Sequence, residues 1–333
     1  MFLSVTAELA ALEMENAMRD VSLDLGDFRL ERGDVLIDDK VMGRLYGPAD
    51  TPLIVVIGGI SSSRFVGDGG KNNRGWWSNL VHKGGAIDLS KVQVLGYDFA
   101  PDPESENRPS CITTMDQAKR LKALIDYIAN GQIAGFIGSS YGGMVGLQFA
   151  KAFPGALKSL CVISAAHRPY PIGVAWRGIQ RRIVRLALDA GRADEGLKLA
   201  RELAMTTYRT PKEFADRFTL VETQKRPSSF DICDYLGARG DAFAKAMDAE
   251  RFLALSESID IHRVEPEHIS TPTLLMTAIS DQLAPLSEMQ ELRDRLQGPS
   301  ELFTFTSLYG HDAFLKEYDA MSARISKFCE SLI

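Results

Sequence analysis

The residue with the clearest chemical role is a serine, Ser140, which lies in the sequence GSSYG at residues 138–142. The pattern G-x-S-x-G is typical of a sharp turn that exposes a nucleophilic serine between a strand and a helix. An apolar run at 133–137 precedes the turn, and a helical pattern at 144–150 follows it. This context favours a nucleophile over a glycine-rich packing turn.

A serine hydroxyl is a weak nucleophile at its ordinary pKa, so a base must lie within hydrogen-bond reach. In enzymes with this serine turn, the order along the chain is serine, then acid, then histidine. Of the five histidines, His311 follows the last expected strand and is the expected base. Asp281 directly follows an apolar run at 273–279 and is the expected acid. Asp260 and Glu267 are rivals, but neither follows a strand.

Acyl chemistry at a serine also needs two backbone N–H groups that stabilise the negative charge on the reacting carbonyl oxygen. One comes from the residue after the nucleophile, here Tyr141, and the other from a loop after an early central strand. The sequence GGIS at 58–61 occupies that place. We expect Gly59 to supply the second N–H group, with Ile60 as the alternative.

A mostly parallel sheet flanked by helices would bring these residues together, because short apolar runs alternate with helical patterns along the chain. The expected strands are 53–59, 92–98, 133–139, 157–164, 272–280 and 301–306. The expected helices are 115–129, 144–150, 286–296 and a last one from 313 towards the end of the chain. The segment 28–47 resembles an antiparallel pair at the sheet edge.

One long segment interrupts this alternation. From about residue 168 to 265 the sequence is almost entirely helical and amphipathic, without a convincing strand. We therefore expect an α/β core in two parts, residues 1–167 and 266–333, and an inserted helical cap, or lid, at 168–265.

Composition excludes several classes of protein. The chain has 333 residues, of which 45% are apolar and 25% charged, as in globular proteins with a large core. Its 44 acidic and 38 basic residues give a net charge of −6. Without a basic excess to neutralise phosphates, a nucleic-acid partner is not expected.

The cysteines and the amino terminus bear on the compartment. Cys111, Cys161, Cys233 and Cys329 are too far apart for a C-x-x-C pair, so neither a metal site nor a disulfide framework is expected. The first 20 residues have no basic segment before their short apolar stretch, which acidic residues interrupt. We expect a cytoplasmic protein without a membrane span.

The sequence resembles the homoserine O-acyltransferases of the α/β-hydrolase superfamily over most of its length. The similar segments are GWW at 75–77, the turn GSSYGGM, IQRR at 179–182, ARELAMTTYRTPKEFADRF at 200–218, SSFDICDYLGARGDAFAKAMDAERFLAL at 228–255 and YGHDAFL at 309–315. The last of these and the TYR…EF…RF block are the more specific, because G-x-S-x-G occurs throughout the superfamily.

This resemblance implies an α/β-hydrolase fold, with a mostly parallel sheet flanked by helices and an inserted all-helical cap. It also implies a ping-pong transfer in which Ser140 takes an acyl group from acyl-CoA and passes it to the hydroxyl of homoserine, in methionine biosynthesis. Acyl-CoA would be a co-substrate, with no permanently bound cofactor. The family's arginine for the amino-acid carboxylate corresponds to Arg181, and its aspartate for the ammonium to Asp312. The resemblance further implies a homodimer formed through the cap.

The arginines of this segment are open to a second interpretation. Arg177, Arg181 and Arg185 are spaced i, i+4, i+8 and share one helix face. A guanidinium on a rigid helix suits bidentate binding of a carboxylate. We favour that role for Arg181 and expect Arg177 and Arg185 to belong to a solvated basic face.

The choice of substrates stays open at this point. The loop GGISSSR departs from the common family version, and Arg64 at its end could pair with the carboxylate of a succinyl donor. Acetyl-CoA and succinyl-CoA are both possible donors, and homoserine and serine are both possible acceptors. A carboxylic-ester hydrolase would use the same triad, with water in place of the acceptor. A catalytically silent binding scaffold is a third class, and the three filled triad positions argue against it.

Overall fold

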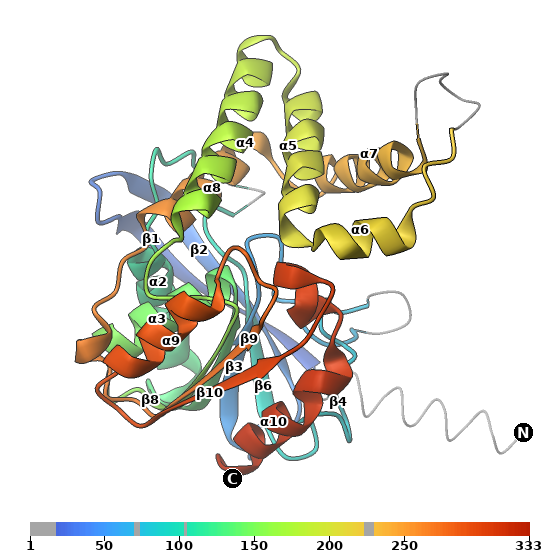
Figure 1. Ribbon diagram of the computed structural model, residues 1–333. Helices are drawn as coiled ribbons and strands as arrows, with labels where there is room; N and C mark the ends of the chain where they lie inside the picture. The colour runs from blue at the N-terminus through green and yellow to red at the C-terminus, as the bar shows by residue number, and fades with distance from the viewer. Residues whose placement is uncertain (1–17, 70–73, 103–104, 223–229) are drawn as a thin grey trace, which may run out of the picture.

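The computed structural model describes residues 18–69, 74–102, 105–222 and 230–333, and its centre is an eight-stranded sheet (Figure 1). The strand order is β1-β2-β6-β3-β7-β8-β9-β10. These strands are β1 (Met18–Arg29), β2 (Val35–Tyr46), β3 (Leu53–Ile57), β6 (Gln93–Tyr97), β7 (Ile133–Ser139), β8 (Leu157–Ile163), β9 (Thr273–Ala278) and β10 (Ser300–Phe305). A separate short parallel pair consists of β4 (Val81–His82) and β5 (Ile87–Asp88).

The sheet is parallel from β6 to β10 and antiparallel at one edge, where β2 pairs with β1 and β6. The mostly parallel sheet predicted from the sequence is confirmed. The antiparallel edge pair, β1 and β2, begins earlier in the chain than the pair expected at 28–47. Its first strand begins at Met18, and residues 30–33 turn the chain, with Leu30 N–H donating to the Asp34 carbonyl and Gly33 at a φ of 103°.

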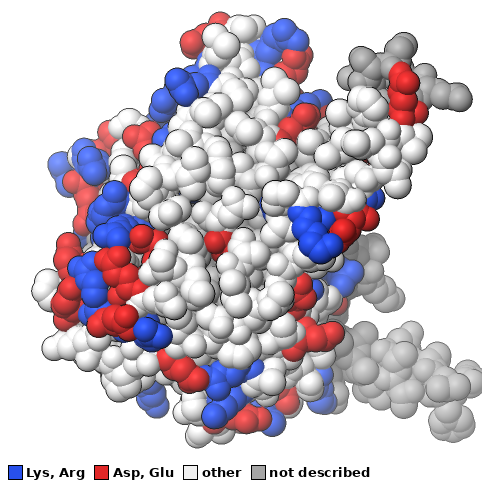
Figure 2. Space-filling model, in the orientation of Figure 1, with Lys and Arg blue, Asp and Glu red and all other residues white. Residues whose placement is uncertain are grey.

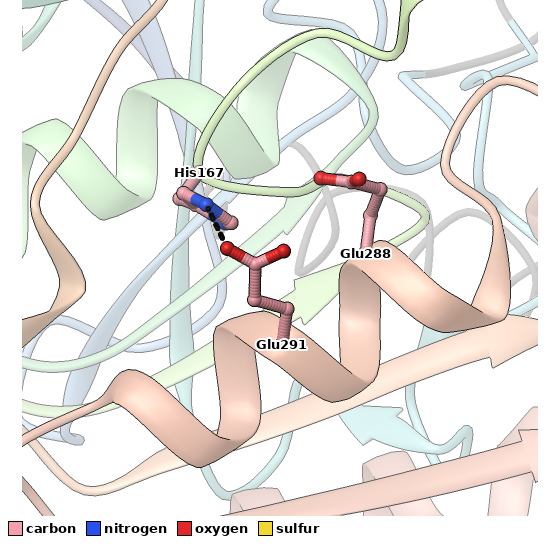
Figure 3. Close-up of side chains that lie close together, drawn as sticks. All are labelled: His167, Glu288 and Glu291. Carbon is pink, nitrogen blue, oxygen red and sulfur yellow. Dashed lines mark ion pairs between the residues drawn. The ribbon is translucent and has the colours of Figure 1, made fainter.

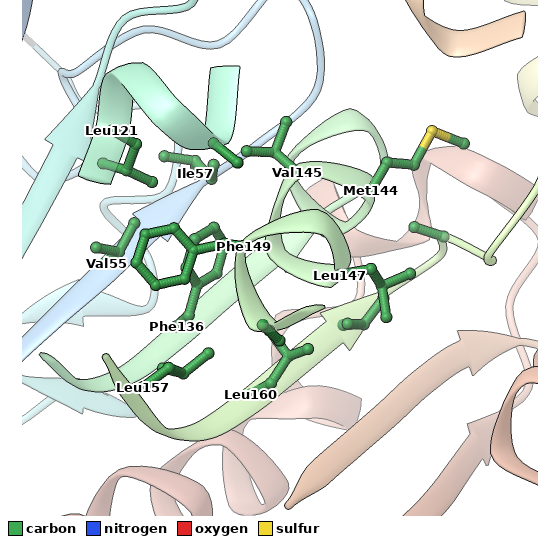
Figure 4. Close-up of a cluster of buried hydrophobic side chains, with 14 of the residues drawn as sticks. Val55, Ile57, Leu121, Phe136, Met144, Val145, Leu147, Phe149, Leu157 and Leu160 are labelled. Atoms are coloured by element: carbon green, nitrogen blue, oxygen red, sulfur yellow. The ribbon is translucent and has the colours of Figure 1, made fainter. Parts of the chain in front are cut away.

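Three helices cover one face of the sheet: α2 (Thr114–Ala129), α3 (Tyr141–Ala152) and α9 (Leu286–Arg295). Between them and the sheet lies a buried apolar cluster that includes Phe136 and Phe149, whose ring centroids are 5.8 Å apart (Figure 4). Burying a side chain of this size contributes about 1.5–3 kcal/mol to folding. This layer fixes α3, the helix that begins directly after Ser140.

The other face is covered by α10 (Tyr318–Glu330), by Val66 and by the segment 74–92. The segment contains Trp77, which is fully buried and donates its indole N–H to the Phe314 carbonyl at 2.8 Å. Phe314 belongs to the 3-10 turn η2 (Gly310–Leu315), so the expected last helix begins only at Tyr318. The tryptophan thereby anchors the turn that contains His311.

In the described residues, five helices stand over one end of the sheet and form what we call the cap (Figure 1). They are α4 (Pro171–Asp189), α5 (Ala193–Tyr208), α6 (Pro211–Arg217), α7 (Asp231–Ala244) and α8 (Ala249–Ile261). In the chain they lie between β8 and the turn η1 (Pro266–His268), which precedes β9. The cap has an apolar cluster of its own, which includes Val184, Leu197, Phe243 and Phe252.

On the face of the molecule shown in Figure 2, charged side chains of both signs lie mostly towards the edges, and the middle of the face is largely uncharged. Within the described residues, no helix is both long enough and apolar enough to cross a bilayer. The expectation about the amino terminus concerns residues 1–17, which lie outside the described ranges.

Candidate active site

The turn after β7 holds Ser140 in a conformation that few side chains adopt, with φ 52° and ψ −121°. The flanking glycines are required by close backbone approach. A Cβ on Gly138 would lie 2.3 Å from the carbonyl oxygen of Gly142, and one on Gly142 would lie 2.5 Å from that of Ile57. The glycines of G-x-S-x-G therefore allow the sharp reversal that exposes the serine.

The three expected triad residues lie in one hydrogen-bonded chain. Ser140 Oγ is 2.9 Å from His311 Nε2, and His311 Nδ1 is 2.9 Å from Asp281 Oδ2. Asp281 follows β9 and is 3% exposed, and its second oxygen accepts the N–H groups of Leu283 and Ala284. The acid is thus fixed by the backbone, and it orients the imidazole towards the serine.

Two opposing effects act on the pKa of His311. Burial acts to lower it, but the nearby Asp281 carboxylate acts to raise it, through its charge and its hydrogen bond, with a further contribution from Asp312. The net effect is a pKa above the ordinary histidine value. A base of this kind accepts a proton readily, and the Asp281 carboxylate stabilises the imidazolium that forms.

The backbone near Ser140 offers the N–H groups expected for an oxyanion hole. A Cβ built on Gly59 would lie 3.9 Å from the Ser140 Cβ, so this loop passes directly beside the nucleophile. Within the described part of the chain, the N–H groups of Gly59, Ile60 and Tyr141 have no protein acceptor. Tyr141 is also the first residue of α3, where the helix dipole favours negative charge.

A cavity of about 250 Å³ lies between the core and the cap, with Ser140 and His311 in its wall. The core contributes the loop at 59–62 and the turn η2, and the cap contributes side chains from α4, α5 and α8. The serine therefore lies in a cavity whose wall is formed by both the core and the cap.

The cap arginines do not lie as the sequence analysis predicts. Arg177 lines the cavity, whereas Arg181 is absent from its lining. Both are 13% exposed and share one carboxylate: Arg177 Nε lies 2.6 Å from Asp260 Oδ1, and Arg181 Nη2 lies 2.6 Å from Oδ2. Arg181 also donates to the carbonyl and hydroxyl oxygens of Ser256. Arg177 and Arg181 are four residues apart and lie on the same face of α4, but of the two only Arg177 reaches the cavity.

Asp312 lies in the cavity wall next to the catalytic histidine position, and it is buried. Its Oδ2 accepts a hydrogen bond of 3.2 Å from Arg209 Nε, and Arg209 also pairs with Glu213. The cap and this turn are linked again where the N–H and hydroxyl of Thr210 donate to the Leu308 carbonyl. Asp312 therefore lies in the cavity wall with one cationic neighbour, Arg209, and its role towards a substrate ammonium stays a prediction.

Arg64 does not reach the catalytic cavity, which corrects the role considered for it. Its guanidinium pairs with Asp98, and its backbone N–H donates to the same carboxylate at 2.6 Å. It lines a separate, larger hollow of about 880 Å³, which shares Ser61 and Ser62 with the catalytic cavity. The pairing with Asp98 holds the Arg64 side chain in this second hollow.

Behind the cavity, His167, Glu288 and Glu291 have possible metal-ligand atoms within 4.8 Å of one another (Figure 3). However, Arg168 pairs with both glutamates, and Arg295 pairs with Glu291 at 2.9 Å. Burial lowers the pKa of His167. Two guanidinium groups already supply the positive charge that these carboxylates attract, so we describe the group as an ion-pair network between α9 and the start of the cap.

Sequence analysis missed two cap residues in the cavity wall, Arg201 and Tyr208. The Tyr208 ring centroid is 5.9 Å from that of His311. The Arg201 guanidinium lies over the Tyr208 ring, 5.5 Å from its centroid. Both belong to the block at 200–218 that carries the family resemblance. Their i, i+7 spacing places them on one face of α5, and that spacing is a signal from which they could have been found.

Comparisons with known proteins identify the family of the chain. A family model described as alpha/beta hydrolase fold matches residues 52–318. The chain is 38% identical over 284 residues to a homoserine O-succinyltransferase of Xanthomonas campestris pv. campestris, covering 84% of this chain and 76% of the relative. It is 26% identical to a homoserine O-acetyltransferase of Moorella thermoacetica, covering 90% and 91%. The crystal structure of esterase E22 superposes with a TM-score of 0.83 at 21% identity, covering 94% and 100%.

The fold and the extent of the family match define the class: the chain belongs to the α/β-hydrolase family. Within that class it belongs to the homoserine O-acyltransferases, as the identity to the Xanthomonas relative shows. The likeness to esterase E22 concerns the fold alone.

Proposed function

We propose that this protein is an acyl-CoA-dependent O-acyltransferase that moves an acetyl or succinyl group to the side-chain hydroxyl of L-homoserine, in methionine biosynthesis. The observation that carries the proposal is the chain Ser140–His311–Asp281 in the wall of a cavity that the cap closes. Relatives named for homoserine acyl transfer, with either donor, support this choice of reaction.

The first half-reaction acylates the serine. Ser140 Oγ attacks the thioester carbonyl of acyl-CoA while its proton passes to His311 Nε2. The N–H groups of Tyr141 and of Gly59 or Ile60 stabilise the oxyanion. The carbon–sulfur bond then breaks, and CoA leaves as the thiol after it receives the proton from His311. Asp281 stabilises the imidazolium that forms between these steps.

The second half-reaction transfers the acyl group. The homoserine hydroxyl gives its proton to His311 Nε2 and attacks the acyl carbon. The bond from that carbon to Ser140 Oγ breaks, and the serine recovers the proton. Asp312 would receive the homoserine ammonium. In the structure Arg177 is better placed than Arg181 to receive its carboxylate, because only Arg177 lines the cavity.

A matrix of two donors and two acceptors tests the proposal. Acetyl-CoA and succinyl-CoA are each incubated with homoserine or serine, and CoA release is followed together with the acylated product. We expect rapid CoA release that depends on homoserine, and parallel double-reciprocal lines when both substrates are varied. Intersecting lines would indicate direct transfer without an acyl-enzyme. If the protein acylated serine in preference to homoserine, serine would be assigned as the acceptor.

A carboxylic-ester hydrolase is the second candidate, because the same triad could deliver an acyl group to water and an esterase shares the fold. The charged residues of the cavity wall, among them Arg177, Arg201 and Asp312, favour an amino-acid acceptor over water. Sustained CoA release from acyl-CoA without any amino acid would favour the hydrolase.

The proposal includes a homodimer formed through the cap. Large apolar side chains are exposed on α4 and α5, among them Leu186 at 74%, Leu199 at 53% and Ile179 at 40%. Exposed apolar side chains on neighbouring helices are typical of contact surfaces. Light scattering of the purified protein should give the mass of a dimer, and Leu186→Lys should shift it towards the monomer.

A further inference from the structure

Two hollows adjoin the catalytic cavity, and they differ in charge. The larger one, which Arg64 lines, shares Ser61 and Ser62 with the cavity. The smaller one, of about 390 Å³, shares Trp76 and Leu315 with it. A donor with a long arm could extend from the serine into either hollow, so the charges of the two walls decide which of them suits the donor.

The wall of the larger hollow is acidic. Five carboxylates outnumber three cationic side chains there: Asp38, Asp39, Asp98, Asp102 and Glu106 against Lys40, Arg64 and Arg251. The wall of the smaller hollow is basic. Among the described residues, its charged side chains are Arg74 and Lys316, without a carboxylate. An anion would therefore be repelled from the first hollow and attracted to the second.

The contacts of Arg74 and Lys316 leave their charges available. Arg74 donates to the side-chain oxygens of Asn79, at 2.7 Å, and of Ser78, at 3.4 Å. In the part of the chain that the structure describes, no carboxylate lies within ion-pair distance of Arg74 or Lys316. Two such cations in one hollow of a protein with a net charge of −6 are suited to bind phosphate groups.

Trp76 connects the smaller hollow to the reacting atoms. A Cβ on Gly58, which begins the expected oxyanion loop, would lie 3.0 Å from the Trp76 ring. The Trp76 indole N–H donates to the Ser63 carbonyl at 3.1 Å, which fixes the ring beside this loop. Leu315, the other shared residue, ends the turn η2 that contains His311. Two apolar side chains thus lie where the smaller hollow meets the catalytic cavity.

We infer that the nucleotide end of the acyl-CoA donor lies in the smaller hollow, where Arg74 and Lys316 bind its phosphate groups. The inference rests on the proposed function, because it requires acyl-CoA as the donor. CoA carries its phosphates at the end remote from the thiol, so the pantetheine arm would pass Trp76 and Leu315 on its way to Ser140. The phosphates remain far from the reacting carbonyl, so their contacts contribute to donor affinity and not to the rate of the bound complex.

Donors with and without the nucleotide test the inference. Wild-type protein, Arg74→Gln, Lys316→Gln and the double variant are mixed with acetyl-CoA or succinyl-CoA, or with the corresponding acyl-pantetheine, which lacks the phosphates and the adenosine. Acyl-enzyme formation without an acceptor is followed by rapid quenching and intact-protein mass over a range of donor concentrations. Lys40→Gln is the matched control, because it removes one exposed positive charge from the wall of the larger hollow.

We expect the wild-type protein to be acylated at lower concentrations of acyl-CoA than of acyl-pantetheine. Each single variant should raise the acyl-CoA concentration at half-maximal rate by about threefold, and the double variant by about tenfold, because exposed phosphate contacts are partly screened. The maximal rate should stay the same. Acylation by acyl-pantetheine should not change, which also shows that the variants are folded. Lys40→Gln should match the wild type with both kinds of donor.

Four results would overturn the inference. A double variant with the wild-type response to acyl-CoA would show that the two cations do not bind it. Equal losses with acyl-CoA and acyl-pantetheine would give them a structural role. A loss with acyl-CoA confined to Lys40→Gln would assign the nucleotide to the larger hollow. A wild-type protein that uses both kinds of donor at the same concentration would have no nucleotide site. Absence of acyl-enzyme with every donor would instead contradict the proposed function itself.

Discussion

The core and the cap contribute to the same cavity by different means. The core contributes Ser140, His311 and Asp281 from turns that follow parallel strands, where backbone hydrogen bonds and close packing fix each position. The cap contributes Arg177 and Arg201 from the sides of helices, where an ion pair or aromatic rings fix the head groups. Under the proposed function, reactivity would depend on backbone geometry, whereas substrate choice would depend on side-chain pairs that can change without disturbing the sheet.

The largest effect should come from the core. Ser140→Ala removes the nucleophile and should lower kcat by about 10⁴-fold or more, with the melting temperature nearly unchanged. His311→Ala should be similarly damaging, and the double variant no slower than the worse single variant, because the two residues act as a unit. Steady-state assays of all three proteins check this. A double variant far slower than either single one would show that the two residues work independently.

A change at the junction of core and cap should have a smaller and more selective effect. Under the proposed function Asp312 binds the ammonium of homoserine, and Asp312→Asn would keep the side-chain shape but lose this charged contact. A contact of this kind is worth roughly 1.5–3 kcal/mol, so kcat/KM for homoserine should fall about 10- to 150-fold. Acyl-enzyme formation involves no homoserine and should change much less. Burst measurements separate the two steps, and equal damage to both would assign Asp312 to holding the histidine turn.

Within the cap, the two arginines that share Asp260 should differ. Arg177→Gln should raise KM for homoserine by about tenfold, because it removes the cation that lines the cavity. Arg181→Gln should cost only a few-fold, since Arg177 retains its carboxylate partner. Homoserine saturation curves for both variants show which substitution raises KM more. The reverse ranking would restore Arg181 as the residue that binds the substrate carboxylate.

The smallest expected effect is a shift in pH dependence. His311 must be neutral to accept the serine proton, so kcat/KM for acyl-CoA should fall as the pH drops through its pKa. That pKa is raised, which places the midpoint above the ordinary value of 6.5. Because the Asp312 charge contributes to the increase, Asp312→Asn should move the midpoint to lower pH by up to about one unit. A midpoint that moves upward would contradict this electrostatic coupling.

The core could be predicted from the sequence because its signals are local. A nucleophilic turn has an apolar strand before it and a helix after it, which identifies Ser140. The carboxyl ends of parallel strands lie at one edge of the sheet. Asp281 and His311 could therefore be predicted as the acid and the base from their order along the chain. The extent of the first strand could not be predicted in the same way. The turn at 30–33 lies within residues that are also compatible with a strand.

The cap could be predicted as helical, but not which of its side chains reach the cavity. Arg177 and Arg181 share a helix face, and their difference depends on Asp260 and Ser256, which lie on another helix far along the chain. Arg64 likewise lies outside the cavity because Asp98, at the end of a neighbouring strand, binds it. Contacts between such distant segments leave no periodicity in the sequence.

The hydrogen bonds between the cap and the region of turn η2, which contains His311, also affect how the protein opens. Arg209 binds Asp312, and Thr210 binds Leu308, so detaching this part of the cap would leave a buried carboxylate without its cation. Because an unpaired buried charge is costly, the cap and the turn around His311 should unfold locally as one cooperative unit, with similar protection of their amide hydrogens from exchange. A molecule with a detached cap would therefore also lose its base, and it could not discharge acyl-CoA to water.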